Sequence, residues 1–70
     1  MKHFAICIEN KGNEASLEKK KLYEYLPDEI LEIKNLIKVI DESGEDYIYP
    51  SGFFIPVPFP ENIQQQLELV

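Results

Sequence analysis

The stretch LIKVIDESGEDYIYP, residues 36–50, decides the fold because it reads either as the end of a helix or as a β-hairpin. Its outer parts, LIKVI and YIY, are dense in β-branched and aromatic residues, which favour strands. Between them, Gly44 adopts the positive φ of a tight turn without steric cost, and the flanking carboxylates stay hydrated at the loop tip. We therefore predict a strand over residues 36–41 and a reversal at Ser43 and Gly44. A second strand over residues 47–49 ends at the proline that follows it.

A single amphipathic helix over residues 28–41 is the alternative, and it would make the protein an α+β fold. Pro27 suits the start of such a helix and Gly44 its end, and isoleucines recur between them at helical spacing. In the β-rich interpretation, residues 27–32 form a turn or a short helical fragment ahead of the strand. The isoleucines at helical spacing are Ile30, Ile33, Ile37 and Ile40.

Three further segments complete the strand pattern. Residues 2–9 alternate like a strand, and residues 53–57 read as a short edge strand because prolines crowd this part of the chain. Residues 14–26 fit a helix or, at their end, a strand. The strand is favoured because it contains Tyr23 and Tyr25, which would share one of its faces. The first segment carries Phe4, Ile6 and Ile8 on one face and His3, Ala5 and Cys7 on the other.

These segments predict one domain, residues 1–70, of the mainly β class: a small antiparallel β-barrel of about five strands. Residues 61–70 add a short C-terminal helix, with Ile63 and Val70 at helical spacing after a proline. A chain of 70 residues has room for one domain only and buries roughly 60% of the surface that its unfolded form exposes. We therefore expect marginal stability.

The charge balance is acidic, with 13 Asp and Glu residues against seven basic ones, all lysine, and a formal net charge of -6. Nucleic-acid affinity comes largely from Lys and Arg displacing counterions from phosphate, so we expect no nucleic-acid partner. No apolar run is long enough to cross a membrane or to act as a signal peptide, so we expect a cytoplasmic protein without membrane contact. The single cysteine makes no internal disulfide.

Two segments resemble parts of Src-homology-3 domains. EASLEKKKLYEYL, residues 14–26, is similar to their diverging turn, and YIYPSGFFIPV, residues 47–57, to their closing section. In that section a strand ends at proline, one helical turn follows, and the last strand starts with an aromatic residue. The resemblance implies a Src-homology-3-like barrel. The chain has no tryptophan, and its first strand lacks the aromatic-rich opening that lines the family's peptide groove.

The whole chain also resembles a group of small bacterial proteins of unknown activity. They share the segment YEYLPDE, here residues 23–29, and the run VIDESGEDYIYP, here residues 39–50. This second likeness covers nearly the full length of the chain. It implies a fold and no chemistry.

Aromatic residues beside prolines form the candidate contact surface, which comprises Tyr49, Pro50, Phe53 and Phe54. Phe53 and Phe54 are neighbours on the predicted strand and point to opposite faces, so at least one of them meets solvent or a partner. The more ordinary interpretation is that these rings cover the C-terminal helix or an open barrel end. The expected function is a non-catalytic protein-interaction or regulatory module of a bacterial cytoplasm, a monomer or weak homodimer whose partner is another protein.

Four carboxylates crowd the predicted turn: Asp41, Glu42, Glu45 and Asp46. Their spacing does not match the ligand positions of a common calcium loop, so we expect a solvated turn rather than a metal site. A divalent-ion-responsive protein using the acidic hairpin, residues 41–46, is the alternative function. His3 and Cys7 have no further His or Cys to complete a zinc site. We expect no cofactor, and no catalysis in a domain too small for a deep pocket.

Overall fold

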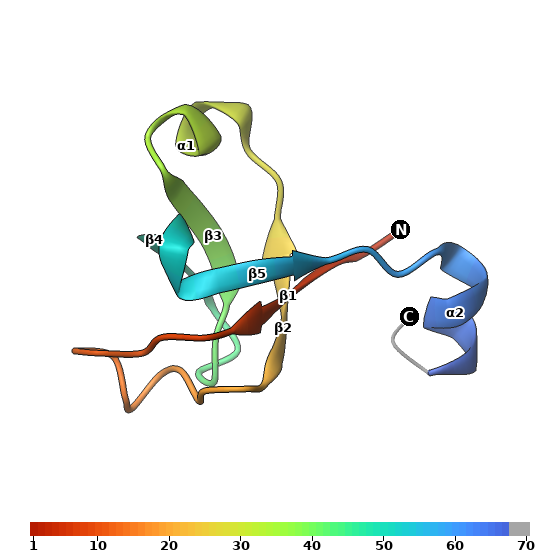
Figure 1. The fold of residues 1–70 in the computed structure, drawn as a ribbon, viewed down its shortest axis with the longest axis horizontal. Helices are drawn as coiled ribbons and strands as arrows, with labels where there is room; N and C mark the ends of the chain where they lie inside the picture. Colours follow the sequence, from red (N-terminus) through yellow and green to blue (C-terminus); the bar gives the residue numbers. More distant parts are fainter. Residues whose placement is uncertain (68–70) are drawn as a thin grey trace.

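The computed structural model describes residues 1–67, which form a five-stranded antiparallel sheet with two short α-helices and one 3-10 turn (Figure 1). The mainly β prediction is therefore confirmed. In chain order the elements are β1 (His3–Cys7), β2 (Leu22–Leu26), α1 (Glu29–Ile33), β3 (Leu36–Ile40), β4 (Asp46–Pro50), η1 (Ser51–Phe53), β5 (Phe54–Val57) and α2 (Glu61–Gln66). The strand order across the sheet is β4-β3-β2-β1-β5. This order leaves the sheet open, with β4 and β5 at its two edges.

The hairpin predicted from residues 36–50 is present as β3 and β4. Their antiparallel register places Val39 opposite Tyr47. Gly44 takes a φ of 83°, a left-handed conformation that glycine enters without steric cost. Its N–H donates to the Asp41 carbonyl at 2.9 Å, which closes the turn. The predicted reversal at this glycine is therefore confirmed.

The alternative helix over residues 28–41 is wrong, because the helix that begins there ends after five residues. In α1, the Asp28 side chain caps the first turn by accepting from the N–H groups of Ile30 and Leu31. Asn35 then takes a φ of 58°, which asparagine tolerates better than most residues. This residue turns the chain out of the helix and into β3.

The isoleucine spacing that suggested a long helix has a different cause. Ile30 and Ile33 lie on the solvent side of α1, and Ile33 is 83% exposed. Ile37 and Ile40 belong instead to β3, where residues three positions apart point to opposite faces of the sheet. The helical period is therefore a coincidence of a short helix followed directly by a strand.

One hydrophobic core lies against a single face of the sheet and takes a side chain from every strand. β1 lies between β2 and β5, and the two small residues on its core-facing side, Ala5 and Cys7, have no exposed surface. The rings of Tyr23 and Phe54, on the two flanking strands, meet edge to face with centroids 6.4 Å apart. The buried apolar residues of the core are Ala5, Cys7, Leu17, Tyr23, Val39, Tyr49 and Phe54.

The long connection between β1 and β2 supplies the core residue Leu17. The Leu17 N–H donates to the Asn13 carbonyl at 2.9 Å, and the Leu17 carbonyl accepts from the Asn10 side-chain amide at 2.9 Å. Lys20 has a φ of 68°, and its N–H donates to the Cys7 carbonyl at 2.7 Å, which draws the ends of the loop together. The strand predicted around the two tyrosines follows directly and is confirmed as β2.

The C-terminal helix α2 returns to the start of β1, and Figure 1 shows it beyond the end of β5 on the side of the N-terminus. Gln64 of α2 is buried, and its amide donates to the carbonyls of Lys2 and Phe59, each at 2.9 Å. The Phe59 ring meets Phe4 edge-on at 6.0 Å. The predicted C-terminal helix is confirmed as α2, whereas Val70 lies outside the described residues.

Leu17→Ala is expected to lower the free energy of unfolding by about 2–5 kcal/mol, because it empties a fully buried position in a small core. Leu67→Ala is the matched control. Leu67 is 53% exposed, so its truncation is expected to change stability by less than about 0.5 kcal/mol. Urea denaturation followed by circular dichroism measures both. Equal effects of the two substitutions would contradict the placement of Leu17 in the core.

Candidate functional site

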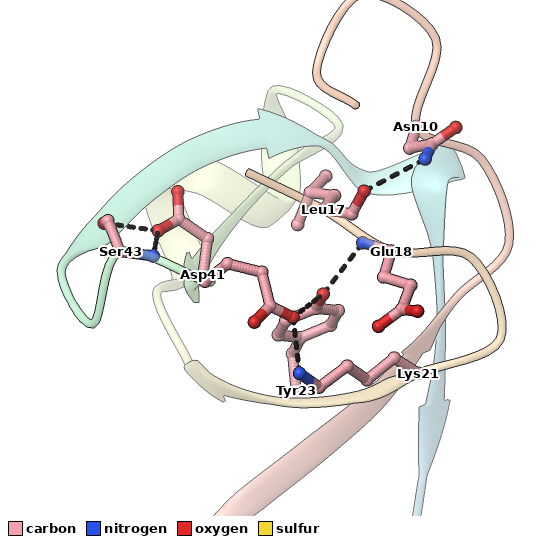
Figure 2. A network of polar contacts seen from close by, with 8 residues as sticks. Asn10, Leu17, Glu18, Lys21, Tyr23, Asp41 and Ser43 are labelled. Carbon is pink, nitrogen blue, oxygen red and sulfur yellow. Dashed lines mark hydrogen bonds and ion pairs between the residues drawn. The ribbon is translucent and has the colours of Figure 1, made fainter. Parts of the chain in front are cut away.

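The first carboxylate of the acidic hairpin, Asp41, is buried and bound inside the fold. Its side chain accepts from the Tyr49 hydroxyl at 2.5 Å, from the Ser43 hydroxyl at 2.5 Å and from the Ser43 N–H at 2.9 Å. Figure 2 shows Ser43 folded back onto this carboxylate. The three donors replace the water that burial removes, so Asp41 holds the turn in shape.

The second carboxylate, Glu42, is bound by two side chains from β2 and the loop before it. It accepts from the Tyr23 hydroxyl at 2.5 Å and lies 2.6 Å from the Lys21 ammonium. The same Tyr23 oxygen accepts from the Glu18 N–H at 2.8 Å (Figure 2). The hairpin is thereby attached to a segment about twenty residues earlier in the chain.

Tyr23, Asp41, Glu42 and Tyr49 together form what we term the tyrosine–carboxylate clasp. Two contacts with Ser16 complete it: the Ser16 hydroxyl lies 3.2 Å from the Tyr49 hydroxyl oxygen, and the Glu42 N–H donates to the Ser16 carbonyl at 3.0 Å. Each buried phenol thus has a partner at its polar end while its ring lies in the core. The clasp fastens the loop between β1 and β2 to the β3–β4 hairpin.

The clasp moves the pKa of each of its groups away from neutral pH. Burial alone would raise the pKa of Asp41, but hydrogen bonds from Ser43 and Tyr49 outweigh it and hold that pKa below its ordinary value. Lys21, and then Tyr23, lower the pKa of Glu42. Burial, followed by hydrogen bonds to these carboxylates, raises the pKa of both tyrosines. Near pH 7 the two carboxylates therefore stay ionised and the two phenols stay protonated, which suits structure better than general acid–base chemistry.

An ion site at the acidic hairpin would use four carboxylates, and two of them, Asp41 and Glu42, are already hydrogen-bonded in the clasp. Glu45 lies exposed at the loop tip, where its carboxylate accepts from the Tyr47 hydroxyl at 3.3 Å, and Asp46 is exposed at the start of β4. Within residues 1–67, no group of three or more His, Cys, Asp or Glu side chains is arranged to hold a metal ion. An ion bound through Asp41 would compete with the hydroxyl donors of Ser43 and Tyr49.

The predicted contact residues divide between the core and the surface. Tyr49 and Phe54 are buried in the core, Phe53 is half-buried against it, and Pro50 is exposed. The expectation that Phe53 and Phe54 alternate along one strand fails because β5 begins only at Phe54 and Phe53 ends η1. On this surface, a partner would therefore meet Pro50 and part of Phe53, whereas Tyr49 and most of Phe54 are covered.

A pocket of about 370 Å³ opens between α1, the adjoining ends of β2 and β3, η1 and β5. Among its lining residues, Tyr25 and Ile37 pack against the core and Phe54 belongs to it. Its charged lining residues are Asp28, Glu32 and Lys38. The apolar lining includes Tyr25, Leu31, Leu36, Ile37, Phe54 and Pro56. The sequence analysis missed this pocket because its walls come from segments that are separated along the chain, and periodicity carries no sign of their proximity.

Comparison of the chain with protein-family models, with curated proteins and with solved structures finds no match. None of the helices in the described part of the chain has the length and apolar character needed to span a membrane. The clasp and the pocket are therefore the features from which a function can be argued, because a fold by itself does not define one.

Tyr49→Phe is expected to destabilise the protein by about 1–3 kcal/mol, because Asp41 would lose a hydroxyl donor while staying buried. Tyr47→Phe is the matched control, since it removes the same hydroxyl from an exposed residue of the same strand and is expected to leave stability unchanged. Chemical denaturation of both variants near neutral pH provides the comparison. If Tyr49→Phe were as stable as wild type, the bond to Asp41 would not contribute to stability.

Asp41 is also expected to make stability depend on acid pH. Its pKa in the folded chain lies below the ordinary value of 3.8, so its stabilising contribution is complete above about pH 4 and is lost as the pH falls through the folded-state pKa. Asp41→Asn should therefore be less stable than wild type at neutral pH, and the difference should shrink below about pH 4. Urea unfolding of both proteins across this range measures the gap. A gap that stays constant would show that the charge of Asp41 has no role.

Proposed function

We propose that this chain is a non-catalytic protein-interaction module of a bacterial cytoplasm, built as a partly open Src-homology-3-like barrel. The support for the barrel is that all five strands contribute to one core. The rings of Tyr49 and Phe54 belong to the two edge strands, yet their centroids lie 6.1 Å apart. A sheet whose two edge strands share a core in this way curls round on itself. The helical turn η1 between β4 and β5 agrees with the resemblance.

The pocket beside α1 carries the proposal of an interaction site. Its volume of about 370 Å³ lies in the range of small ligand pockets, roughly 300–1,000 Å³. Three of its apolar lining residues, Tyr25, Ile37 and Phe54, belong to the core or pack against it, which supports a preformed pocket with aromatic and aliphatic surface for an entering side chain. Such a pocket suits one large apolar side chain of a partner, which is how anchor residues in protein interfaces bind.

The charges around the pocket indicate what flanks that anchor. The charged residues that line the pocket are two carboxylates, Asp28 and Glu32, and one cation, Lys38. The whole chain carries a net charge of -6. Complementary charge steers association and disfavours partners of the same sign. The proposed ligand is therefore an extended segment of another protein that has a large apolar residue close to a Lys or Arg.

The pKa shifts in the clasp support the non-catalytic part of the proposal. The carboxylates of Asp41 and Glu42 have lowered pKa values, and the phenols of Tyr23 and Tyr49 have raised ones. A general acid or base works best with a pKa near the working pH, and these shifts run in the opposite direction. The Cys7 thiol is buried, and desolvation raises its pKa, which opposes formation of a nucleophilic thiolate.

Peptides selected against the wild-type protein from a random display library are expected to share an apolar residue near a basic one. Leu31→Glu places a charge in the pocket and should weaken the binding of these peptides by at least about tenfold. Ile33→Glu is the matched control, because Ile33 lies on the same helix, is exposed and does not line the pocket. Isothermal titration calorimetry measures the affinities, and circular dichroism checks that each variant is folded.

Three outcomes would contradict the proposal. The first is a library that yields no binding peptide. The second is selected peptides that bind folded Leu31→Glu as tightly as wild type, and the third is an equal loss of affinity in the two variants. The first outcome would contradict the proposed interaction function. Either of the other two would show that the peptides do not bind in the pocket.

A further inference from the structure

The strand β4 presents an open edge that the rest of the chain does not cover. It pairs with β3 on one side and is the last strand in the sheet order. Four of its five residues are exposed, including Tyr47 and Ile48. The opposite edge, β5, contains Pro56 in its interior, which lacks an N–H and interrupts pairing there, whereas β4 has its proline, Pro50, only at its end. An uncovered edge strand with apolar side chains and no lysine readily pairs with another strand.

The hydrogen bonds of the hairpin determine which groups of β4 face outward. The Asp41 N–H donates to the Glu45 carbonyl at 3.1 Å, which marks these two residues as a hydrogen-bonded pair. Such pairs recur at every second position, so the backbone groups of Tyr47 point towards β3. The N–H and C=O groups of Asp46 and Ile48 therefore point to the open edge.

The Asp46 carboxylate and the missing N–H of Pro50 together favour one register for pairing β4 with β4 of a second copy. A two-fold axis passes through a pair of identical residues, which are either outward ones (Asp46, Ile48 or Pro50) or the inward ones between them (Tyr47 or Tyr49). Centring on Tyr47 would leave the two Asp46 carboxylates only two residues apart along the strand, about 7 Å at ~3.3 Å per residue and within a Debye length of ~8 Å. Centring on Tyr49 would place Pro50 opposite Ile48 on both sides of the axis, so each of these pairs would lose a hydrogen bond. Centring on Asp46 would place two carboxylates face to face, and centring on Pro50 would place two residues without an N–H opposite each other. Centring on Ile48 avoids each of these faults at the axis.

We propose that the chain forms a symmetric homodimer in which β4 pairs antiparallel with β4 of a second copy, centred on Ile48. Ile48 then meets the partner's Ile48, and their backbones exchange both hydrogen bonds. Asp46 lies opposite the partner's Pro50, where the missing N–H leaves only one bond, from the Asp46 N–H to the proline carbonyl. The two Asp46 side chains lie about 13 Å apart at ~3.3 Å per residue, more than a Debye length of ~8 Å at physiological salt.

The size and charge of this contact predict how the dimer behaves. A five-residue strand gives a small interface, so dimerisation should depend strongly on concentration. Each copy has a net charge of -6, so the two copies repel each other at long range. Salt screens that repulsion, and the dimer should strengthen as ionic strength rises. The pocket contains no β4 residue, so the dimer and the proposed peptide site are independent.

Sedimentation equilibrium from about 10 µM to about 1 mM tests the proposal by mass action. The apparent mass of wild type should rise from the 8.2 kDa of one chain towards twice that value. Ile48→Lys should keep the protein monomeric, because it sets two ammonium groups face to face on the axis. Ile55→Lys is the matched control, since Ile48 and Ile55 are 51% and 53% exposed on the two edge strands.

Mixing the Ile48→Lys variant with an Ile48→Glu variant tests the register. Neither should dimerise alone, and the equimolar mixture should, because this register places the new Lys and Glu directly opposite each other. Circular dichroism checks that all variants are folded. A wild type that stays at 8.2 kDa throughout would overturn the homodimer and leave the edge to a strand of another protein. A dimer that survives Ile48→Lys, is lost in Ile55→Lys, or fails to form in the mixture would overturn the proposed interface.

Discussion

The reversal of the chain between β3 and β4 is the constraint on which the rest of the structure depends. Gly44 makes it possible by taking a φ of 83°, and Asp41 holds it by accepting three hydrogen bonds from Ser43 and Tyr49. Without this turn, Tyr49 would not reach the core and β4 would not form the edge of the sheet. The acidic hairpin is therefore a structural element first, because two of its four carboxylates, Asp41 and Glu42, are hydrogen-bonded within the fold.

A chain of 70 residues buries few side chains, and this one extends its core by using tyrosines. Tyr23 and Tyr49 place their rings in the core and their hydroxyls at its border, where these hydroxyls donate to Glu42 and Asp41. The clasp thereby joins the apolar core to the loop that carries Leu17. Such a network combines burial with a specific register, because each phenol has its partner in only one arrangement of loop and hairpin.

The two proposed contacts use different parts of the same small sheet. The pocket lies where α1 crosses the ends of β2 and β3, and the self-pairing edge lies along β4. α1 matters to the first because Asp28 caps it and Asn35 ends it, which holds Leu31 over the pocket. A dimer through β4 would present two copies of the pocket, so a partner with two suitable segments would gain affinity from bivalent binding.

The amino-acid pattern by itself determined the strands, the short C-terminal helix and the reversal at Gly44, because these depend on local alternation, on proline and on glycine. It also predicted correctly that residues 28–41 are not one helix. The burial of Tyr49 and Phe54, the pairing of Asp41 with Tyr49 and the pocket beside α1 were decided only by the tertiary structure. Each of these arises where segments distant in sequence meet, and a local pattern carries no information about which segments those are.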